Sequence, residues 1–238
     1  MPTCMAGRRK VNGTLIDGTG FTYECGEVLS GLLAQRISPL FSQPTTGEWV
    51  FGLVTRAASD GVFERGVGIF PVGNAGPTEH FHPNYSEQFQ VVLGEFLFTL
   101  NGKEHHARAG EELTILPGTP HTFRCTGADP GCSAGVVIVE TRPAARTGEV
   151  ISTLFGMAHE GLLTQSGQPR FLHAMMIASE YADDTLFTSP PPAFVSGLAT
   201  LLAPVARWRG YRATEARYLE PSFWDEHVEQ PILDVADS

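Results

Sequence analysis

Two histidines separated by one residue, with a glutamate soon after them, constrain this chain more than any other feature. They are His80, His82 and Glu87 in the segment HFHPNYSE. Residues i and i+2 of a β-strand point to the same face, so an extended backbone aims both imidazoles at one point. His121 follows a Pro-Gly turn further along. If neighbouring strands bring Glu87 and His121 alongside, the four offer three nitrogens and one oxygen to a divalent transition metal.

The residues around these four are arranged as short apolar runs separated by turn signals. Glu87 leads into an apolar run that ends at Gly94, and the next run ends at Asn101-Gly102, a dipeptide that closes two-residue hairpins. Such patterns predict strands over residues 49–56, 62–72, 86–93, 95–100, 103–107, 113–116, 122–125 and 134–140. The sequence therefore predicts a mainly β fold.

This arrangement resembles the cupin superfamily, in particular its single-barrel, quercetinase-like metalloproteins. The first motif of that family is matched by His80, His82, Glu87 and Gly94, and the second by Gly110, Gly118 and His121. Three turn or supporting positions differ from the family pattern, namely Asn74, Leu116 and Cys125. The resemblance covers about residues 45–142 and implies an antiparallel double-stranded β-helix (the cupin jelly-roll barrel) with the metal inside its mouth.

The rest of the chain is predicted to form an extension on each side of this barrel. We expect an N-terminal extension over 1–45, with one short helix or strand near residues 29–37, the barrel over 46–142 and a C-terminal α-helical extension over 143–238. Helical spacing of apolar residues appears over 150–162 and 169–181. A further helix should be capped by Ser189, run to Trp208 and kink or restart at Pro204.

The ligand types narrow the chemistry without fixing it. Three imidazoles and a carboxylate suit iron, nickel, copper, manganese or zinc. One hypothesis is a metal-dependent oxygenase of the dioxygenase type, in which a small organic substrate and dioxygen meet at the metal. A redox-neutral isomerase, epimerase or lyase is the alternative, and a non-catalytic module that binds a small ligand is a third. A barrel of this kind hosts many reactions, so the resemblance does not choose among them.

Several side chains near the ligands are candidates for the substrate pocket. Glu87 is assigned as a ligand and possible base. The strand period places Phe89 on the same inward face as Glu87, with Gln88 outward. Tyr85 could donate a hydrogen bond to a substrate, and the remaining candidates are aromatic or aliphatic side chains that could line the pocket. The pocket set is Tyr85, Phe89, Phe98 and Phe123, with Phe70 and Val91 as further inward candidates.

Composition limits the partners and the location. A formal net charge of −10 and the lack of a basic stripe in the barrel region argue against nucleic acid as a partner. No apolar run is long enough for a membrane span, and the first residues lack the apolar stretch of a secretory signal. We therefore expect a cytoplasmic protein that binds a small molecule. The resemblance implies a homodimer.

The four cysteines are expected as free thiols, although Cys125 and Cys132 could form a bridge.

Overall fold

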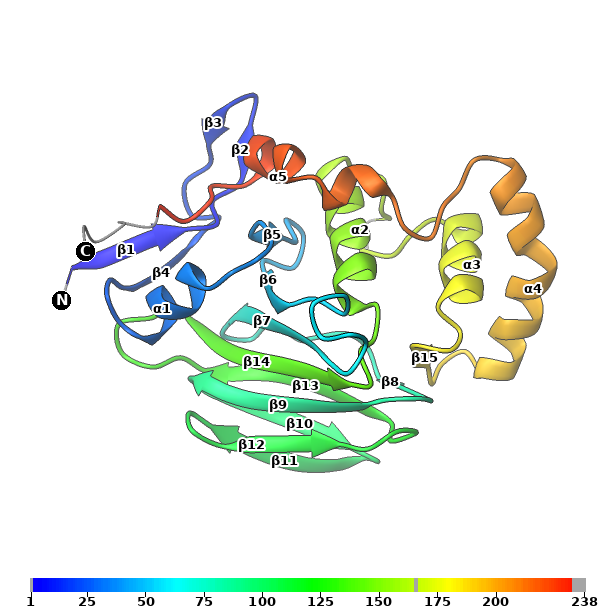
Figure 1. Ribbon diagram of the computed structural model, residues 1–238, viewed down its shortest axis with the longest axis horizontal. Helices are drawn as coiled ribbons and strands as arrows, with labels where there is room; N and C mark the ends of the chain where they lie inside the picture. The colour runs from blue at the N-terminus through cyan, green and yellow to red at the C-terminus, as the bar shows by residue number, and fades with distance from the viewer. Residues whose placement is uncertain (1, 165–166, 233–238) are drawn as a thin grey trace.

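Two antiparallel sheets face each other in the computed structural model, which describes residues 2–164 and 167–232 (Figure 1). The larger sheet has six strands in the order β12-β9-β14-β7-β6-β5, and every pairing in it is antiparallel. Its strands are β5 (Phe41–Ser42), β6 (Trp49–Val54), β7 (Glu64–Pro71), β9 (Ser86–Leu93), β12 (Glu112–Ile115) and β14 (Ala134–Arg142).

The second sheet has five strands in the order β11-β10-β13-β8-β15, again antiparallel. Its strands are β8 (His80–Phe81), β10 (Glu95–Leu100), β11 (Lys103–Arg108), β13 (His121–Gly127) and β15 (Leu186–Phe187). The predicted fold class is confirmed: an antiparallel jelly-roll barrel with a largely helical C-terminal part. Two of the strands, β9 and β10, begin and end at the predicted residues, and Gly94 marks the turn between them.

The turn at Gly94 shows why a glycine is needed there. Gly94 has φ of 83°, in the left-handed region that residues with a side chain rarely adopt. A Cβ atom at this position would also collide with the backbone oxygen of Gly127, which lies on the neighbouring strand β13. The close approach of the two chains therefore excludes any larger residue. This explains the glycine of the first motif in structural terms.

The space between the two sheets is filled mainly by aromatic rings. Each strand turns alternate residues inward, and the inward residues of both sheets form one buried cluster. The cluster comprises Phe70, Phe89, Val91, Phe96, Phe98, Ala107, Ile115, Phe123, Cys125 and Val137. Seven strands of the two sheets contribute to it, so the barrel has a packed interior that supports the site at one end.

The N-terminal residues pack on the outer face of the larger sheet. They form β1 (Thr3–Ala6), β2 (Lys10–Val11), β3 (Thr14–Leu15), β4 (Phe21–Glu24) and α1 (Val28–Ala34). Leu29 and Leu33 of α1 share a hydrophobic cluster with Trp49 of the barrel and Trp224 near the C-terminus. The two ends of the chain thus share a core with the barrel. The division at residues 45 and 142 stays a prediction.

The C-terminal part contains four α-helices and one 3₁₀ helix among the described residues. They are α2 (Thr147–His159), α3 (Phe171–Glu180), α4 (Pro192–Trp208), η1 (Ala216–Leu219) and α5 (Pro221–His227). The helices α3 and α4 lie side by side at the end of the molecule opposite β1 (Figure 1). The strand β15, which precedes α4, belongs to the five-stranded sheet, so this part of the chain also completes the barrel. Among the described helices, none has both the length and the apolar character that a membrane crossing requires.

Two details of α4 differ from the prediction. Ser189 does not cap the helix, which begins at Pro192 without a side-chain cap. A proline in a first turn needs no cap for its own nitrogen, because it has no N–H. The helix also continues through Pro204 without restarting there, and the alternative, a kink at Pro204, stays a prediction. Pro204 lies on the exposed side, where solvent can reach the carbonyl that the proline ring leaves unpaired.

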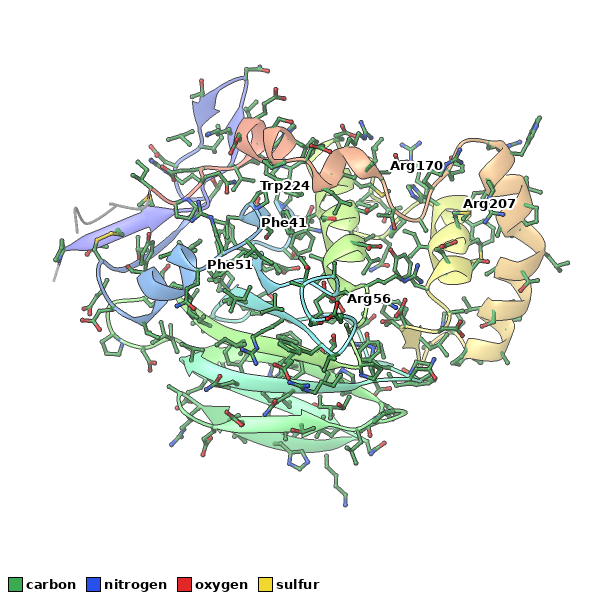
Figure 2. All side chains as sticks on the ribbon, in the orientation of Figure 1. Phe41, Phe51, Arg56, Arg170, Arg207 and Trp224 are labelled. Atoms are coloured by element: carbon green, nitrogen blue, oxygen red, sulfur yellow. A yellow bond between two sulfur atoms is a disulfide. The ribbon has the colours of Figure 1, made fainter. Side chains whose placement is uncertain are left out.

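The prediction of free thiols is wrong for Cys4 and Cys25, which form a disulfide visible beside β1 (Figure 2). Pairing of β1 with β4 brings the two residues together, with their Cα atoms 5.3 Å apart. The sequence alone did not indicate this pairing, because both strands are only four residues long. Cys125 and Cys132 are free thiols, as predicted, and the bridge considered between them does not form.

Candidate metal centre

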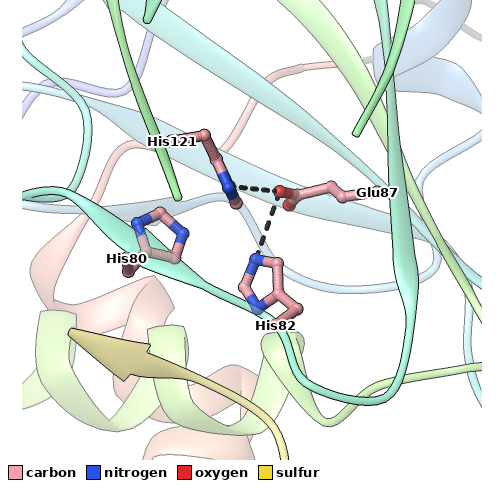
Figure 3. A group of neighbouring side chains, drawn as sticks. All are labelled: His80, His82, Glu87 and His121. Carbon is pink, nitrogen blue, oxygen red and sulfur yellow. Dashed lines mark hydrogen bonds and ion pairs between the residues drawn. The ribbon is translucent and has the colours of Figure 1, made fainter. Parts of the chain in front are cut away.

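Two sheets and three strand ends bring the four predicted ligands to one place (Figure 3). His80 lies in β8 and pairs with His121 of β13 across the five-stranded sheet, with ring centroids 4.3 Å apart. His82 follows β8 directly, and its ring centroid lies 4.9 Å from that of His80. Glu87 approaches from β9 of the opposite sheet. The site therefore bridges the two layers of the barrel.

The four side chains are close enough to share one ion. Each offers a ligand atom, and these atoms all lie within 4.8 Å of one another. The Oε2 atom of Glu87 is 3.2 Å from Nε2 of His121 and 3.3 Å from Nε2 of His82. All four residues are buried, and His121 has no exposed surface at all. Within the described chain, this is the group of histidine, cysteine and acidic residues that could hold a metal ion.

Hydrogen bonds to backbone carbonyls fix the tautomer of each histidine. A carbonyl oxygen only accepts, so the Nδ1 atom that contacts it must carry the proton. Nε2 of the neutral ring then offers its lone pair to the centre of the site, as in histidines that bind metals. The Nδ1 contacts are 2.9 Å for His80 to Thr78, 3.0 Å for His82 to Asp184 and 2.9 Å for His121 to Thr119.

The pKa values show how these charges interact. Burial opposes ionisation of Glu87, but the neighbouring imidazoles of His121 and His82 outweigh it and hold the pKa of the carboxyl well below its usual value. For His121, burial is opposed and outweighed by the hydrogen bond to Glu87, which raises the pKa of the imidazole. Burial, together with the neighbouring His121, lowers the pKa of His80 to about 4. The site thus favours one positive charge facing one carboxylate.

One buried atom tests whether this donor set fits a metal. Nε2 of His82 has no hydrogen-bond partner, although it is shielded from solvent. Its nearest charged neighbour is Oε2 of Glu87, so in the neutral ring two acceptor atoms face each other. Leaving the buried Nε2 atom of His82 unpaired costs about 1–3 kcal/mol. A cation between the two atoms removes that cost, and imidazole with carboxylate suits a divalent transition metal.

Residues 66–138 match the family model described as a cupin domain. Residues 66–138 of this chain are a cupin domain. The matched residues contain all four side chains of the site.

Several solved structures are similar to this cupin barrel. KdgF from Halomonas sp. is 20% identical over 43% of this chain and 84% of its own, with a TM-score of 0.37. Pac13 from Streptomyces, a nucleoside dehydratase, is 20% identical over 47% of this chain and 80% of its own, also with a TM-score of 0.37. A predicted oxalate decarboxylase from Thermotoga maritima is 21% identical over 45% and 93%, with a TM-score of 0.39. A comparison with curated proteins gives no match.

The predicted pocket residues occupy two different positions in the cupin domain. Tyr85 stacks on the ring of His82, with centroids 4.3 Å apart and planes inclined by 19°. Burial, together with the nearby Glu87 carboxylate, raises the pKa of this phenol, which therefore stays protonated and can donate a hydrogen bond. Its hydroxyl lies 3.4 Å from that of Thr185.

Phe89, Phe98 and Phe123 instead form one aromatic cluster in the barrel interior. Their ring centroids lie between 5.0 and 5.8 Å apart. Phe89 and Phe123 each follow a ligand by two residues on the same strand, so they share its inward face. Gln88 points outward and bonds to Glu112, as the strand period predicts.

One part of the site was missed by sequence reasoning. Segment 183–188 contacts His82 and lies beside His80, although it comes about a hundred residues later in the chain. Its strand, β15, has only two residues and gives no periodic signal. The other histidines lie away from the centre. His105 and His106 are exposed on β11, whereas His159 bonds to Ser42 and His173 to the carbonyl of Arg212.

Proposed function

We propose that this cupin domain binds one divalent transition metal through His80, His82, Glu87 and His121. The observation that carries the proposal is the convergence of three Nε2 lone pairs and one carboxylate in a buried site, with Nε2 of His82 left unpartnered. Iron, nickel, copper, manganese and zinc all suit these ligands. Glu87 serves first as a ligand, because its lowered pKa makes it a weak base.

We further propose that the protein is a metal-dependent oxygenase of the dioxygenase type acting on a small organic molecule. A bound metal of this kind can bring a chelating substrate and dioxygen together or act as a Lewis acid. The protein would supply a water-poor barrel lined by Phe89 and Phe123 and a protonated phenol from Tyr85 that orients a substrate oxygen. Quercetinase-like enzymes are the members of the superfamily that the motifs resemble.

The buried polar residues favour an oxygenase over an enzyme that catalyses a redox-neutral reaction. An isomerase, epimerase or lyase needs a further acid or base near the substrate. Apart from the metal cluster and the Tyr85 phenol, the buried histidine and carboxylate of the described chain are His173 and Glu140. Glu140 is held by Arg65 and Arg142, and His173 by the Arg212 carbonyl, so neither is free for such a role.

Metal analysis and oxygen uptake together separate the alternatives. The protein, expressed without a chelating tag, would be assayed for bound metal and for oxygen consumption with a panel of enolic and phenolic compounds. Bound iron, nickel or copper with uptake that depends on the compound supports the oxygenase. Zinc or manganese without uptake favours the redox-neutral alternative. Failure to bind any of the five metals after reconstitution would leave a small-ligand-binding module.

We also propose that the protein is a homodimer, and that the exposed face of α4 forms the contact. Phe194, Leu201 and Trp208 follow one another at seven-residue intervals, so they lie along one face of the helix. They are 64%, 74% and 84% exposed, which is unusual for large apolar side chains gathered in one stripe. Burying this stripe against a second copy would remove it from water.

A cytoplasmic location stays a prediction. The Cys4–Cys25 disulfide weighs against it, since disulfides are rare where glutathione keeps thiols reduced. A fractionation experiment that finds the oxidised protein outside the cytoplasm would overturn the prediction.

A further inference from the structure

One of the three histidines differs from the others in the group that accepts its Nδ1 proton. His80 and His121 donate their Nδ1 protons to carbonyls two residues away, Thr78 and Thr119. His82 donates its proton to the carbonyl of Asp184, 102 residues later in the chain. The hydroxyl of Thr185 lies 3.2 Å from the same nitrogen. The orientation of His82 therefore depends on a segment from the C-terminal part of the protein.

The same segment also pairs with the strand that carries His80. In the antiparallel register of β15 and β8, Phe187 lies opposite His80 and Leu186 opposite Phe81. Thr188 extends the pairing by donating its amide to the carbonyl of Glu79. The ring of Phe187 has its centroid 6.0 Å from that of His80. Segment 183–188 thus contacts both histidines of the His-x-His pair.

Two tethers fix this segment to the rest of the molecule. The side-chain amide of Asn84 donates to the carbonyl of Asp183 at 2.8 Å. The carboxylate of Asp184 accepts from the guanidinium of Arg146, with a distance of 2.9 Å to Nη2. Arg146 stands at the start of α2 and also stacks over the ring of Tyr181, 4.3 Å from its centroid. The Asp184–Arg146 pair is mostly shielded, with side chains 18% and 28% exposed.

We propose that segment 183–188 is a positioning element of the metal site, and that metal binding and docking of this segment stabilise each other. The inference rests on the proposed metal function. Groups that accept a hydrogen bond from a metal-bound histidine fix its ring and raise its basicity, and losing them costs about 10–100-fold in metal affinity. Since coupling between two binding events is reciprocal, an ion that fixes His82 must also hold the segment in place. The segment leads into α3 on one side and α4 on the other, so it links that helix pair to the metal.

A matched pair of variants tests the coupling. Asp184→Asn weakens the tether to Arg146 without touching a ligand. Asp183→Asn makes the same chemical change one residue earlier, at an exposed carboxylate. Zn²⁺ affinity would be measured by competition with a chromophoric chelator on the full-length protein. We expect Asp184→Asn to bind Zn²⁺ about tenfold more weakly, and Asp183→Asn to stay within about twofold of the unchanged protein.

Hydrogen exchange supplies a readout that activity does not. Adding Zn²⁺ to the unchanged protein should slow exchange of the Thr188 amide and its neighbours, while amides of β1 and β4 stay unaffected. If Asp184→Asn fails to fold, Thr185→Val removes the hydroxyl near His82 at nearly constant size and should weaken Zn²⁺ binding in the same direction.

The outcomes distinguish this inference from the proposed function. A protein that binds no Zn²⁺ at all would remove both. Tight Zn²⁺ binding that Asp184→Asn and Thr185→Val leave unchanged, without metal-dependent protection of 183–188, would overturn the coupling and leave the metal site standing.

Discussion

The Nε2 atom of His82 and the Oε2 atom of Glu87 lie 3.3 Å apart across the interior of the barrel, on opposite sides of the space between two sheets. When the His82 ring is neutral, both atoms are acceptors, because its one N–H, at Nδ1, donates to the carbonyl of Asp184. Without an ion, the repulsion between these two acceptors can be relieved only by a proton that a neighbouring histidine shares with Glu87. The buried atoms of the site are therefore arranged for a small cation.

Removing His82 should sharply weaken metal binding. His82→Ala takes away one of four ligands and leaves Glu87 without its neighbour. The affinity for the metal should therefore fall by more than about 100-fold, which exceeds the loss typical when a group that hydrogen-bonds to a ligand is removed. Elemental analysis after dialysis would report the metal content. His105→Ala is the control, because that histidine is exposed on β11. Equal metal content in both variants would contradict the assignment.

The ligand set was predictable from sequence, whereas its support from the C-terminal part was not. His80, His82 and Glu87 lie within eight residues, and the strand period alone places two of them on one face. Asp184 and Thr185 reach His82 only after α2 and α3 have turned the chain back, and no local pattern encodes that return. The Cys4–Cys25 disulfide escaped prediction for a similar reason, since it depends on the pairing of two short strands.

The aromatic cluster in the barrel should contribute strongly to stability. Phe98 is fully buried between Phe89 and Phe123, and its replacement by alanine leaves a cavity in a packed interior. We expect Phe98→Ala to lower the free energy of unfolding by about 3–5 kcal/mol. Urea denaturation would measure it. Phe171→Ala deletes the same side chain at a site that is 59% exposed, and should change the free energy by less than about 0.5 kcal/mol.

A histidine outside the metal site should make stability depend on pH. Burial, with the neighbouring His227, lowers the pKa of His159 to about 4, whereas the unfolded chain has the ordinary value of 6.5. The unfolded state therefore binds a proton first as the pH falls. The stability that His159 contributes is fully present above pH 6.5 and is lost as the pH falls towards 4, by at most about 3 kcal/mol.

Replacing this histidine isolates its share of the pH dependence. His159→Gln keeps a polar group facing Ser42 but cannot titrate. Unfolding free energies at pH 7, 5 and 4 should fall less steeply for this variant than for the unchanged protein. His106→Gln, at an exposed position, should leave the slope unchanged. Parallel slopes for the His159 variant and the unchanged protein would show that its burial does not govern acid sensitivity.

The apolar stripe on α4 should hold two copies of the protein together. Ala199, Ala203 and Ala206 are buried on one side of the helix, with Ala203 and Ala206 in the cluster shared with α3, while Leu201 and Trp208 on the opposite side are 74% and 84% exposed. Leu201→Asp places a charge in the middle of the stripe, and burying an unpaired charge in an apolar contact costs several kcal/mol. Light scattering should therefore report a dimer for the unchanged protein and a monomer for Leu201→Asp. Thr200→Asp adds the same charge at the neighbouring exposed position and should remain dimeric; a monomeric unchanged protein would remove this face as the contact.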